Sequence, residues 1–247
     1  KDGIYNFGLI KNIKQFPHGG LFINLGVDLQ NHNEVIKNYI RAQESFNTKD
    51  KIQFLKTHSY LFNFNKQYPF TDFNNTLGVI YIVRDPRNVV TSFSKFLNIS
   101  LDETADFMIK GSGDGLSWTS NWSNNYNSWK LFGDYKKYLL IKYEDLTKYP
   151  EKTFLDVLNF IHELKEIKLN LDKNKFEKVI ETTKFEKMKK LEKEQGFSEA
   201  KINAETGEKI PFFNLGPKNK WEKLLDSKTQ TKLEEAFRYE MKELRYL

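Results

Sequence analysis

The stretch of sequence that decides the fold is YIVRDPRNVVTS, residues 81–92. It continues an apolar run that starts at Leu77, and such a run, rich in β-branched residues, is typical of a strand buried in a parallel sheet. Asp85 is a good helix N-cap and Pro86 suits the first helical position, so a helix is predicted over 87–98. The chain therefore passes from a buried strand directly into a helix.

The same order of strand and helix recurs along the chain. Strands are predicted at 52–56, 77–83 and 138–143. Helices are predicted at 34–46, 87–98, 101–109, 118–132, 150–164, 176–182, 185–195 and 227–246. This alternation predicts an α/β fold in which helices cover both faces of a central parallel sheet. A length of 247 residues suits one domain of this kind, and we assign residues 1–247 to it.

The composition excludes several classes of site. The chain has no Cys, which excludes disulfides, thiolate metal sites and a Cys nucleophile. No run of about 18 apolar residues occurs, so no membrane span or stable membrane insertion is predicted. The net charge of +6 favours an anionic ligand. Because this excess is modest and spread thinly along the chain, it does not indicate a nucleic-acid partner. The chain starts at Lys1 without a signal-peptide pattern, and we expect a cytoplasmic protein.

The first candidate site is the junction of strand and helix at Arg84. In parallel sheets, ligands bind beyond the carboxyl ends of the strands, where the next helix offers free amide N–H groups to an anion. The planar guanidinium of Arg84 suits a phosphate, and Ser92 carries a hydroxyl about two helical turns further on. The alternative is that Arg84 pairs with a carboxylate and that Ser92 is an ordinary helix residue.

The second candidate site is the end of the strand at 52–56. Lys56 and His58 are two residues apart in an extended segment and therefore face the same side. A histidine there is suited to act as a general base. The alternative is a structural histidine, and we assign His18, His32 and His162 to surface or packing roles.

The third candidate is Tyr143, at the end of the strand at 138–143. Its alternative role is that of a core aromatic that seals the strand end. Because the carboxyl ends of parallel strands meet at one edge of a sheet, we predict that Lys56, His58, Arg84 and Tyr143 lie at the same edge.

Together these segments resemble the sulfotransferases that use 3′-phosphoadenosine-5′-phosphosulfate (PAPS), from about Phe54 to the C-terminus. The resemblance implies a three-layer sandwich like that of the P-loop nucleoside triphosphatases. In this family a strand ending in Lys-Thr-His carries the catalytic histidine and a lysine, which implies these roles for His58 and Lys56. An Arg and a Ser eight positions later bind the 3′-phosphate, which implies this role for Arg84 and Ser92.

Further motifs extend the resemblance to the rest of the nucleotide. In the family a Tyr-Glu-Asp-Leu segment supplies a tyrosine to the nucleotide, and a Thr-x-Phe-x-x-Met pattern lies against the adenine. A pair of tryptophans precedes the Tyr-Glu-Asp-Leu strand. The matching residues are Tyr143 for the first motif, Thr183, Phe185 and Met188 for the second, and Trp122 and Trp129 for the pair.

The Arg-Lys-Gly motif of the family is only partly kept. It reads NLG at 214–216, five residues ahead of Trp221, so that Gly216 is retained as a nucleotide-binding position while both cations are lost. Lys218 and Lys220 are candidate substitutes for the lost cations. The alternative is that they are exposed surface lysines.

The phosphosulfate loop of the family, Pro-Lys-Ser-Gly-Thr-Thr-Trp, departs further. The residues at 17–20 lack its lysine and hydroxyls, and the glycine-rich stretch at 111–115 follows a predicted helix instead of a strand. We therefore expect that the first strand, its loop and its helix precede this chain. We also expect residues 1–247 alone to show little transfer.

The resemblance implies a reaction. A sulfuryl group moves from PAPS to an acceptor hydroxyl or amine, and adenosine 3′,5′-bisphosphate (PAP) leaves. His58 takes the acceptor proton, Lys56 offsets charge on the leaving oxygen, and no metal is required. The acceptor is expected to be a small molecule or a carbohydrate, with a lid in the segment 94–121; the sequence does not specify the oligomeric state.

Two other functions stay open at this point. A P-loop kinase-like phosphotransferase would need a Gly-Lys-Ser/Thr motif and an Asp that binds Mg²⁺, for which Asp85 is a poor candidate. The other is a catalytically inactive module that binds a nucleotide or a polyanion.

Overall fold

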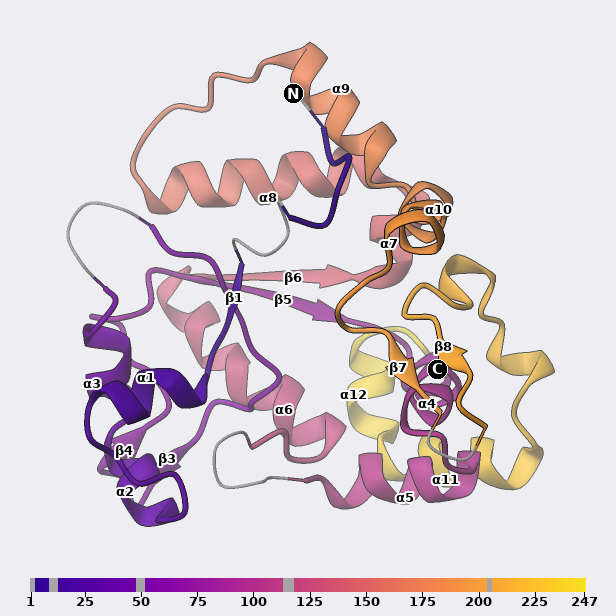
Figure 1. Ribbon diagram of the computed structural model, residues 1–247, viewed down its shortest axis with the longest axis horizontal. Helices are drawn as coiled ribbons and strands as arrows, with labels where there is room; N and C mark the ends of the chain where they lie inside the picture. The colour runs from indigo at the N-terminus through magenta and orange to yellow at the C-terminus, as the bar shows by residue number, and fades with distance from the viewer. Residues whose placement is uncertain (1–2, 9–12, 48–51, 113–117, 204–205) are drawn as a thin grey trace. The chain divides into compact units, whose positions relative to one another are not determined.

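The computed structural model describes residues 3–8, 13–47, 52–112, 118–203 and 206–247. It contains two compact units (Figure 1). Unit 1 comprises Lys1–Leu9, Ile82–Ile109 and Leu140–Leu247, and unit 2 comprises Ile10–Tyr81 and Lys110–Leu139. The glycine-rich stretch predicted at 111–115 and the lid predicted at 94–121 lie partly outside the described residues.

Helices form most of the regular structure, together with short strands. The strands are β1 Lys14–Gln15, β2 Leu55–Lys56, β3 Asn63–Phe64, β4 Tyr68–Pro69, β5 Val79–Val83, β6 Tyr138–Lys142, β7 Lys201–Ile202 and β8 Lys209–Ile210. The α-helices are α1 Gly19–Asn24, α2 His32–Lys37, α3 Tyr39–Glu44, α4 Pro86–Leu97, α5 Leu101–Lys110, α6 Trp122–Trp129, α7 Tyr143–Lys148, α8 Pro150–Leu164, α9 Lys173–Thr182, α10 Phe185–Gln195, α11 Ser227–Ala236 and α12 Arg238–Glu243. The 3₁₀ segments among the described residues are η2 Lys130–Tyr135, η3 Gly216–Lys218 and η4 Trp221–Lys223.

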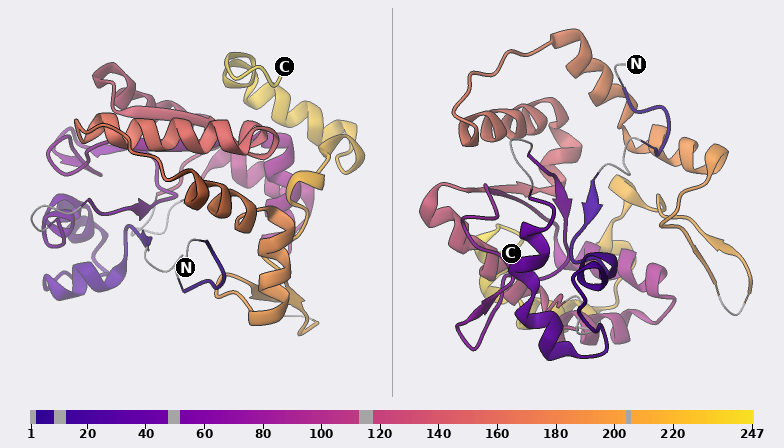
Figure 2. Two further views of the ribbon diagram at one scale, coloured as in Figure 1. Left: turned by 90° about the horizontal axis from the view of Figure 1, so that it is seen from above. Right: turned by 60° about the vertical axis from the view of Figure 1, so that its left-hand side comes forward.

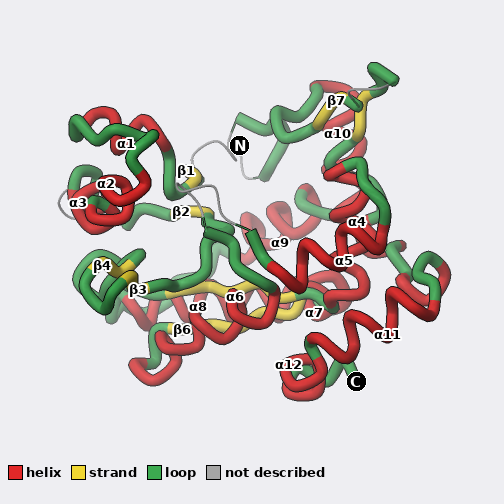
Figure 3. Tube along the Cα trace, turned by 90° about the horizontal axis from the view of Figure 1, so that it is seen from below, coloured by secondary structure: helices red, strands yellow, loops and turns green. Residues whose placement is uncertain are grey.

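The strands predicted from apolar runs are present, but they pair differently from the single sheet expected. Strands β5 and β6 pair with each other (Figures 1 and 3), and the division between the units falls within both of them. Strand β2 instead pairs in parallel with β1, with Lys14 opposite Leu55 and Gln15 opposite Lys56. This pairing is short because Pro17, which has no N–H to donate, follows β1 almost at once. The strand predicted at 52–56 is therefore reduced to two residues.

A strand, a turn and a helix follow one another at residues 14–24, which the sequence did not predict. The helix α1 follows β1, and the His18 ring accepts a hydrogen bond from the Gly20 N–H at 3.2 Å. His18 thus caps α1, in line with the structural role assigned to it. The expectation that a further strand, loop and helix precede the chain stays a prediction.

Aromatic rings form the core of unit 2. The Tyr39 ring is fully buried, and its centroid lies 5.1 Å from that of Phe62, 5.4 Å from that of Phe70 and 5.5 Å from that of Phe22. Most of these pairs are edge-to-face, the geometry that ring quadrupoles favour. The helix α3 is therefore held in place by its contacts with rings from α1 and from the hairpin of β3 and β4.

The helix predicted at 34–46 is interrupted at Asn38. The Asn38 side chain donates to the Glu34 carbonyl at 2.8 Å, and its backbone φ of −110° is outside the helical range. An asparagine that bonds to nearby backbone competes with the helix, and this explains why α2 and α3 are separate. The helix predicted at 227–246 is likewise divided, at Phe237, into α11 and α12.

In unit 1, the decisive stretch forms the helix that the sequence predicts. Asp85 caps α4, because its Oδ1 accepts from the Arg87 N–H at 2.9 Å, and Pro86 occupies the first turn. The helix ends at Asn98, which adopts the left-handed conformation common at helix C-termini. The residues Val90, Thr91 and Ser94 are buried, and α4 packs against α11 and η4.

Arg87 joins α4 to the C-terminal part of unit 1. Its guanidinium pairs with Asp85 at 2.8 Å and with Glu234 at 2.7 Å, and it donates to the Tyr246 carbonyl at 2.6 Å. It also lies 4.0 Å from the centroid of the Trp221 ring. One buried cation therefore holds α4, η4, α11 and the C-terminal residues together.

The remaining part of unit 1 consists of helices and a small hairpin. The helices α8 and α10 have the bounds predicted from the sequence. Strands β7 and β8 pair antiparallel in an orange hairpin, which Figure 1 labels and Figure 2 shows from two further sides. In the described ranges, no helix combines the length and the apolar composition that crossing a bilayer requires.

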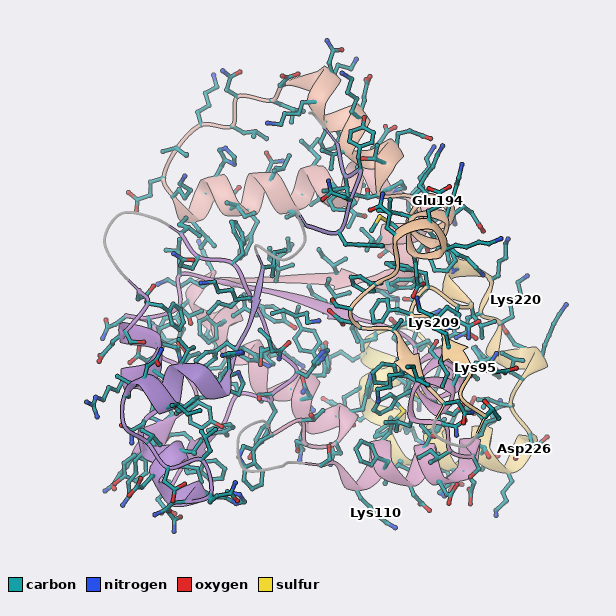
Figure 4. All side chains as sticks on the ribbon, in the orientation of Figure 1. Lys95, Lys110, Glu194, Lys209, Lys220 and Asp226 are labelled. Carbon is teal, nitrogen blue, oxygen red and sulfur yellow. The ribbon has the colours of Figure 1, made fainter. Side chains whose placement is uncertain are left out.

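We predict that Arg87→Met destabilises unit 1 by about 3–5 kcal/mol, because the buried Asp85 carboxylate then loses its partner. The control is Lys95→Met, which removes an exposed cation from the same helix (Figure 4) and should change stability by less than about 0.5 kcal/mol. Urea unfolding of both variants measures the difference. Equal losses would show that the Arg87 contacts contribute nothing specific.

Candidate functional site

Arg84 lies at the end of β5 and contacts groups from two later segments of unit 1. Its Nη2 donates to the Gly216 carbonyl at 2.9 Å, and its guanidinium carbon lies 4.3 Å from the centroid of the Tyr143 ring. Arg84 forms no ion pair within the part of the chain that the structure describes, so the carboxylate pairing considered above is not observed. The structure thus brings three of the predicted nucleotide-binding residues into contact.

The Arg84 guanidinium is also incompletely satisfied. Its Nε is buried and has no hydrogen-bond partner among the described residues. Burial lowers the pKa of Arg84, against the opposing effects of Tyr143 and Glu144, but a guanidinium remains charged at neutral pH. A buried donor without an acceptor costs about 1–3 kcal/mol, and an anion would supply that acceptor.

The carboxyl ends of β5 and β6 are joined through Glu144. Its Oε1 accepts from the Asp85 N–H at 3.3 Å, and its Oε2 accepts from the Tyr246 hydroxyl at 2.9 Å. Burial, followed by the nearby Glu144 charge, raises the pKa of Tyr246. Burial also raises the pKa of Tyr143, so that both hydroxyls stay protonated. Arg84 and Tyr143 therefore share one edge of the sheet.

Ser92 lies on α4 and contacts a residue that sequence reasoning did not single out. The buried Asn219 donates from Nδ2 to the Ser92 hydroxyl at 2.9 Å and to the Asn88 carbonyl at 2.8 Å. Asn219 follows η3, which starts at Gly216, so Ser92 is linked through this segment to the Arg84 contact. A lone polar residue in a loop gives no periodic signal, and nothing in the sequence pattern marks it.

Of the predicted adenine-binding residues, Thr183 is the C-cap of α9, and Phe185 and Met188 lie on α10. An ideal Cβ added at Gly216, whose φ is +52°, would lie 2.3 Å from the Phe185 ring. Only glycine therefore allows this ring to approach the Arg84 contact. Thr183 donates its hydroxyl proton to the Val179 carbonyl at 2.7 Å, and Met188 is buried. Phe185 thus belongs to the Arg84 group, whereas Met188 packs in the interior.

The lysines near the incomplete Arg-Lys-Gly motif have different surroundings. Lys218 pairs with the exposed Glu186 at 2.9 Å, and Lys220 is exposed at the outer side of its segment (Figure 4). Lys189, one turn after Phe185 on α10, donates to the Asn214 carbonyl at 3.0 Å. Lys189 is therefore the lysine that contacts the motif itself, and its place on another helix explains why reading the motif alone missed it.

Lys56 and His58 belong to unit 2. Lys56 lies in β2, where its carbonyl accepts from the Phe16 N–H at 2.8 Å. The His58 carbonyl accepts from Asn125 Nδ2 at 3.0 Å, and Asn125 Oδ1 in turn accepts from the Tyr81 hydroxyl at 2.9 Å. Helix α6 therefore holds the main chain at His58 through one side-chain amide.

The tryptophans of the predicted pair have different surroundings. Trp129 is buried and donates from Nε1 to the Ser59 carbonyl at 3.0 Å, next to His58. Trp122 is half-buried, and its ring stacks on Tyr126 with centroids 6.3 Å apart. Trp129 and Asn125 together fix the segment that carries His58. Asn125 was not predicted, because a single amide in a helix has no spacing signal.

No cluster of three or more His, Asp or Glu side chains that could hold a metal occurs among the described residues. The Asp85 carboxylate, the candidate Mg²⁺ ligand of a phosphotransferase, accepts hydrogen bonds from Arg87 on both of its oxygens. Arg87 neutralises it, and this counts against the phosphotransferase alternative.

We predict that Gly216→Ala destabilises the protein more than Gly207→Ala. Both residues have a positive φ, of +52° and +71°, so each substitution carries a backbone cost of about 1–2 kcal/mol. At Gly207 nothing lies within 4 Å of an added Cβ, whereas at Gly216 the Phe185 ring must move, which adds about 1–3 kcal/mol. Denaturant unfolding measures both; equal costs would contradict the observed approach of Phe185.

Comparisons with known proteins agree with this arrangement. A family profile described as "Sulfotransferase domain" matches residues 11–245. No curated protein matches the sequence.

Solved structures that resemble the chain include mouse sulfotransferase SULT7A1 complexed with PAP, at 20% identity and a TM-score of 0.56, covering 80% of this chain and 69% of that one. Retinol dehydratase in complex with androsterone and inactive cofactor PAP has 16% identity and a TM-score of 0.55, covering 86% of this chain and 65% of that one. Retinol dehydratase in a complex with retinol and PAP has 16% identity and a TM-score of 0.56, covering 81% and 57%. The chain thus spans less than two thirds of the retinol dehydratase chains.

At these identities the structural matches show the fold, which is the P-loop-NTPase-like α/β fold that the resemblance implies. The sequence match covers nearly the whole chain. The chain belongs to the sulfotransferase-domain family.

Proposed function

We propose that this protein transfers a sulfuryl group from PAPS to an acceptor hydroxyl or amine. The observation that carries the proposal is Arg84, a half-buried arginine whose buried Nε has no partner among the described residues and whose guanidinium contacts Gly216 and Tyr143. Family membership and the PAP bound to the structural neighbours support it.

The residues of unit 1 fit the nucleotide by their chemistry. Arg84 and Ser92 offer a guanidinium and a hydroxyl to the 3′-phosphate. The Phe185 ring and Tyr143 offer aromatic surface to the adenine. Because the Thr183 hydroxyl already donates to its own helix, it is left with acceptor capacity, which suits the amino group of adenine.

In the catalytic step, His58 is proposed to act as the general base. The bound donor supplies an activated sulfuryl group and a bisphosphate that can leave. His58 takes the proton from the acceptor oxygen or nitrogen, and Lys56 places positive charge where the leaving oxygen becomes more negative. Asn125 donates to the His58 carbonyl and Trp129 to the carbonyl of the next residue, Ser59, so the main chain at His58 is restricted and the movement of its ring is limited.

We predict that Arg84→Ala weakens binding of adenosine 3′,5′-bisphosphate by about 1.5–3 kcal/mol, because a charge-assisted contact to the 3′-phosphate is lost. Binding of adenosine 5′-phosphate should change little. Calorimetric titration of both nucleotides checks this, with the exposed Arg238→Ala as a control for net charge. An equal loss for both nucleotides would assign Arg84 to some other part of the ligand.

We predict that His58→Ala lowers turnover by about 10²–10⁴-fold, the usual contribution of a general base, and leaves nucleotide affinity nearly unchanged. The measurement is transfer of labelled sulfate from PAPS to a panel of hydroxyl and amine acceptors, by a protein that also carries the strand, loop and helix expected before Lys1. The exposed His32→Ala in the same unit is the matched control. Unchanged turnover in the His58 variant would remove it as the base, and full binding without transfer in the unsubstituted protein would favour the inactive binding module.

A further inference from the structure

The Asn219 side chain occupies an unusual position for a loop residue. It is 5% exposed and reaches α4, where its carboxamide contacts three residues on two successive turns. Its Oδ1 accepts from the Thr91 hydroxyl at 2.9 Å, and its Nδ2 donates to the Asn88 carbonyl at 2.8 Å and to the Ser92 hydroxyl oxygen at 2.9 Å. Both amide protons are therefore used.

The orientation of this carboxamide follows from its partners. The Asn88 carbonyl can only accept, so the Asn219 atom that faces it is the nitrogen. The same nitrogen faces Ser92, and an amide nitrogen cannot accept a hydrogen bond. The Ser92 oxygen is thus the acceptor in this contact, and the Ser92 proton is not used in it.

The usual intrahelical partner of Ser92 is also occupied. A serine inside a helix commonly donates to the carbonyl four residues earlier, which for Ser92 is that of Asn88. That carbonyl already accepts from Asn219. Asn219 therefore donates a hydrogen bond to the Ser92 oxygen. It also donates to the Asn88 carbonyl, and so competes with the Ser92 hydroxyl for that acceptor.

We propose that Asn219 is a positioning residue that holds the Ser92 hydroxyl as a hydrogen-bond donor to the 3′-phosphate of the nucleotide. This inference rests on the proposed function. Asn219 acts through Ser92 and does not itself contact the nucleotide.

The test is a double-mutant cycle with Ser92→Ala, Asn219→Ala and the double variant. Calorimetry measures the dissociation constants of adenosine 3′,5′-bisphosphate and of adenosine 5′-phosphate for each. Asn219→Ala is expected to weaken bisphosphate binding about tenfold, to leave 5′-phosphate binding within twofold, and to have less than a twofold effect when Ser92 is already Ala. If the role of Asn219 were merely structural, Asn219→Ala would weaken the binding of both nucleotides, or would weaken bisphosphate binding equally with Ser92 present and with Ser92 replaced by Ala. Either result overturns the proposal.

Asn219→Asp is the second variant, since it keeps the side-chain volume and the acceptor for Thr91. Its carboxylate accepts the Ser92 proton and brings negative charge toward the phosphate, so bisphosphate binding should fall further than in Asn219→Ala. Binding as tight as in the unsubstituted protein would overturn the inference alone. If the unsubstituted protein binds the bisphosphate no more tightly than the 5′-phosphate, the proposed function fails and the inference fails with it.

Discussion

The Asp85 carboxylate is the group on which the arrangement of unit 1 depends. It caps α4 through the Arg87 N–H and pairs with the Arg87 guanidinium, which in turn holds Glu234 and the Tyr246 carbonyl. Asp85 directly follows Arg84, so the same contact fixes where the chain leaves β5 and which face of α4 carries Ser92. The positions of Arg84 and Ser92 therefore depend on a pair of charged side chains that neutralise each other.

Two arginines three residues apart have different surroundings: those of Arg87 suit a structural role, and those of Arg84 suit the binding of an anion. Arg87 is neutralised by two carboxylates, and hydrogen bonds and charge from Asp85 raise its pKa although burial opposes this. Arg84 meets a neutral carbonyl and an aromatic ring, and burial lowers its pKa. A charge held beside neutral groups retains its attraction for an anion, whereas a paired charge does not. Arg84 is thus the arginine suited to a ligand.

The parts of the fold that the sequence predicted are those that short-range sequence patterns specify. The cap at Asp85, the proline starts of α4 and α8 and the apolar runs of β5 and β6 are short-range patterns, and the elements appear where those patterns lie. The contact of Arg84 with Tyr143 followed from the rule that parallel strand ends meet. The break at Asn38, the pairing of β1 with β2 and the amides of Asn125 and Asn219 depend on single polar residues or distant partners, for which periodicity gives no signal.

In each unit a side-chain amide forms a hydrogen bond that fixes a candidate functional residue. There is a physical reason why a neutral group suits this role. Asn125 bonds the His58 carbonyl and Asn219 bonds Ser92. A carboxamide both donates and accepts, so it can fix a neighbour in either sense without adding charge. A carboxylate about 5 Å from a phosphate would be repelled by it, and the repulsion energy would be about 3 kcal/mol for each unit of phosphate charge at an effective dielectric constant of about 20. That repulsion exceeds the roughly 1 kcal/mol gained from one neutral hydrogen bond, so at an anion site an amide positions a hydroxyl at lower cost than an acid.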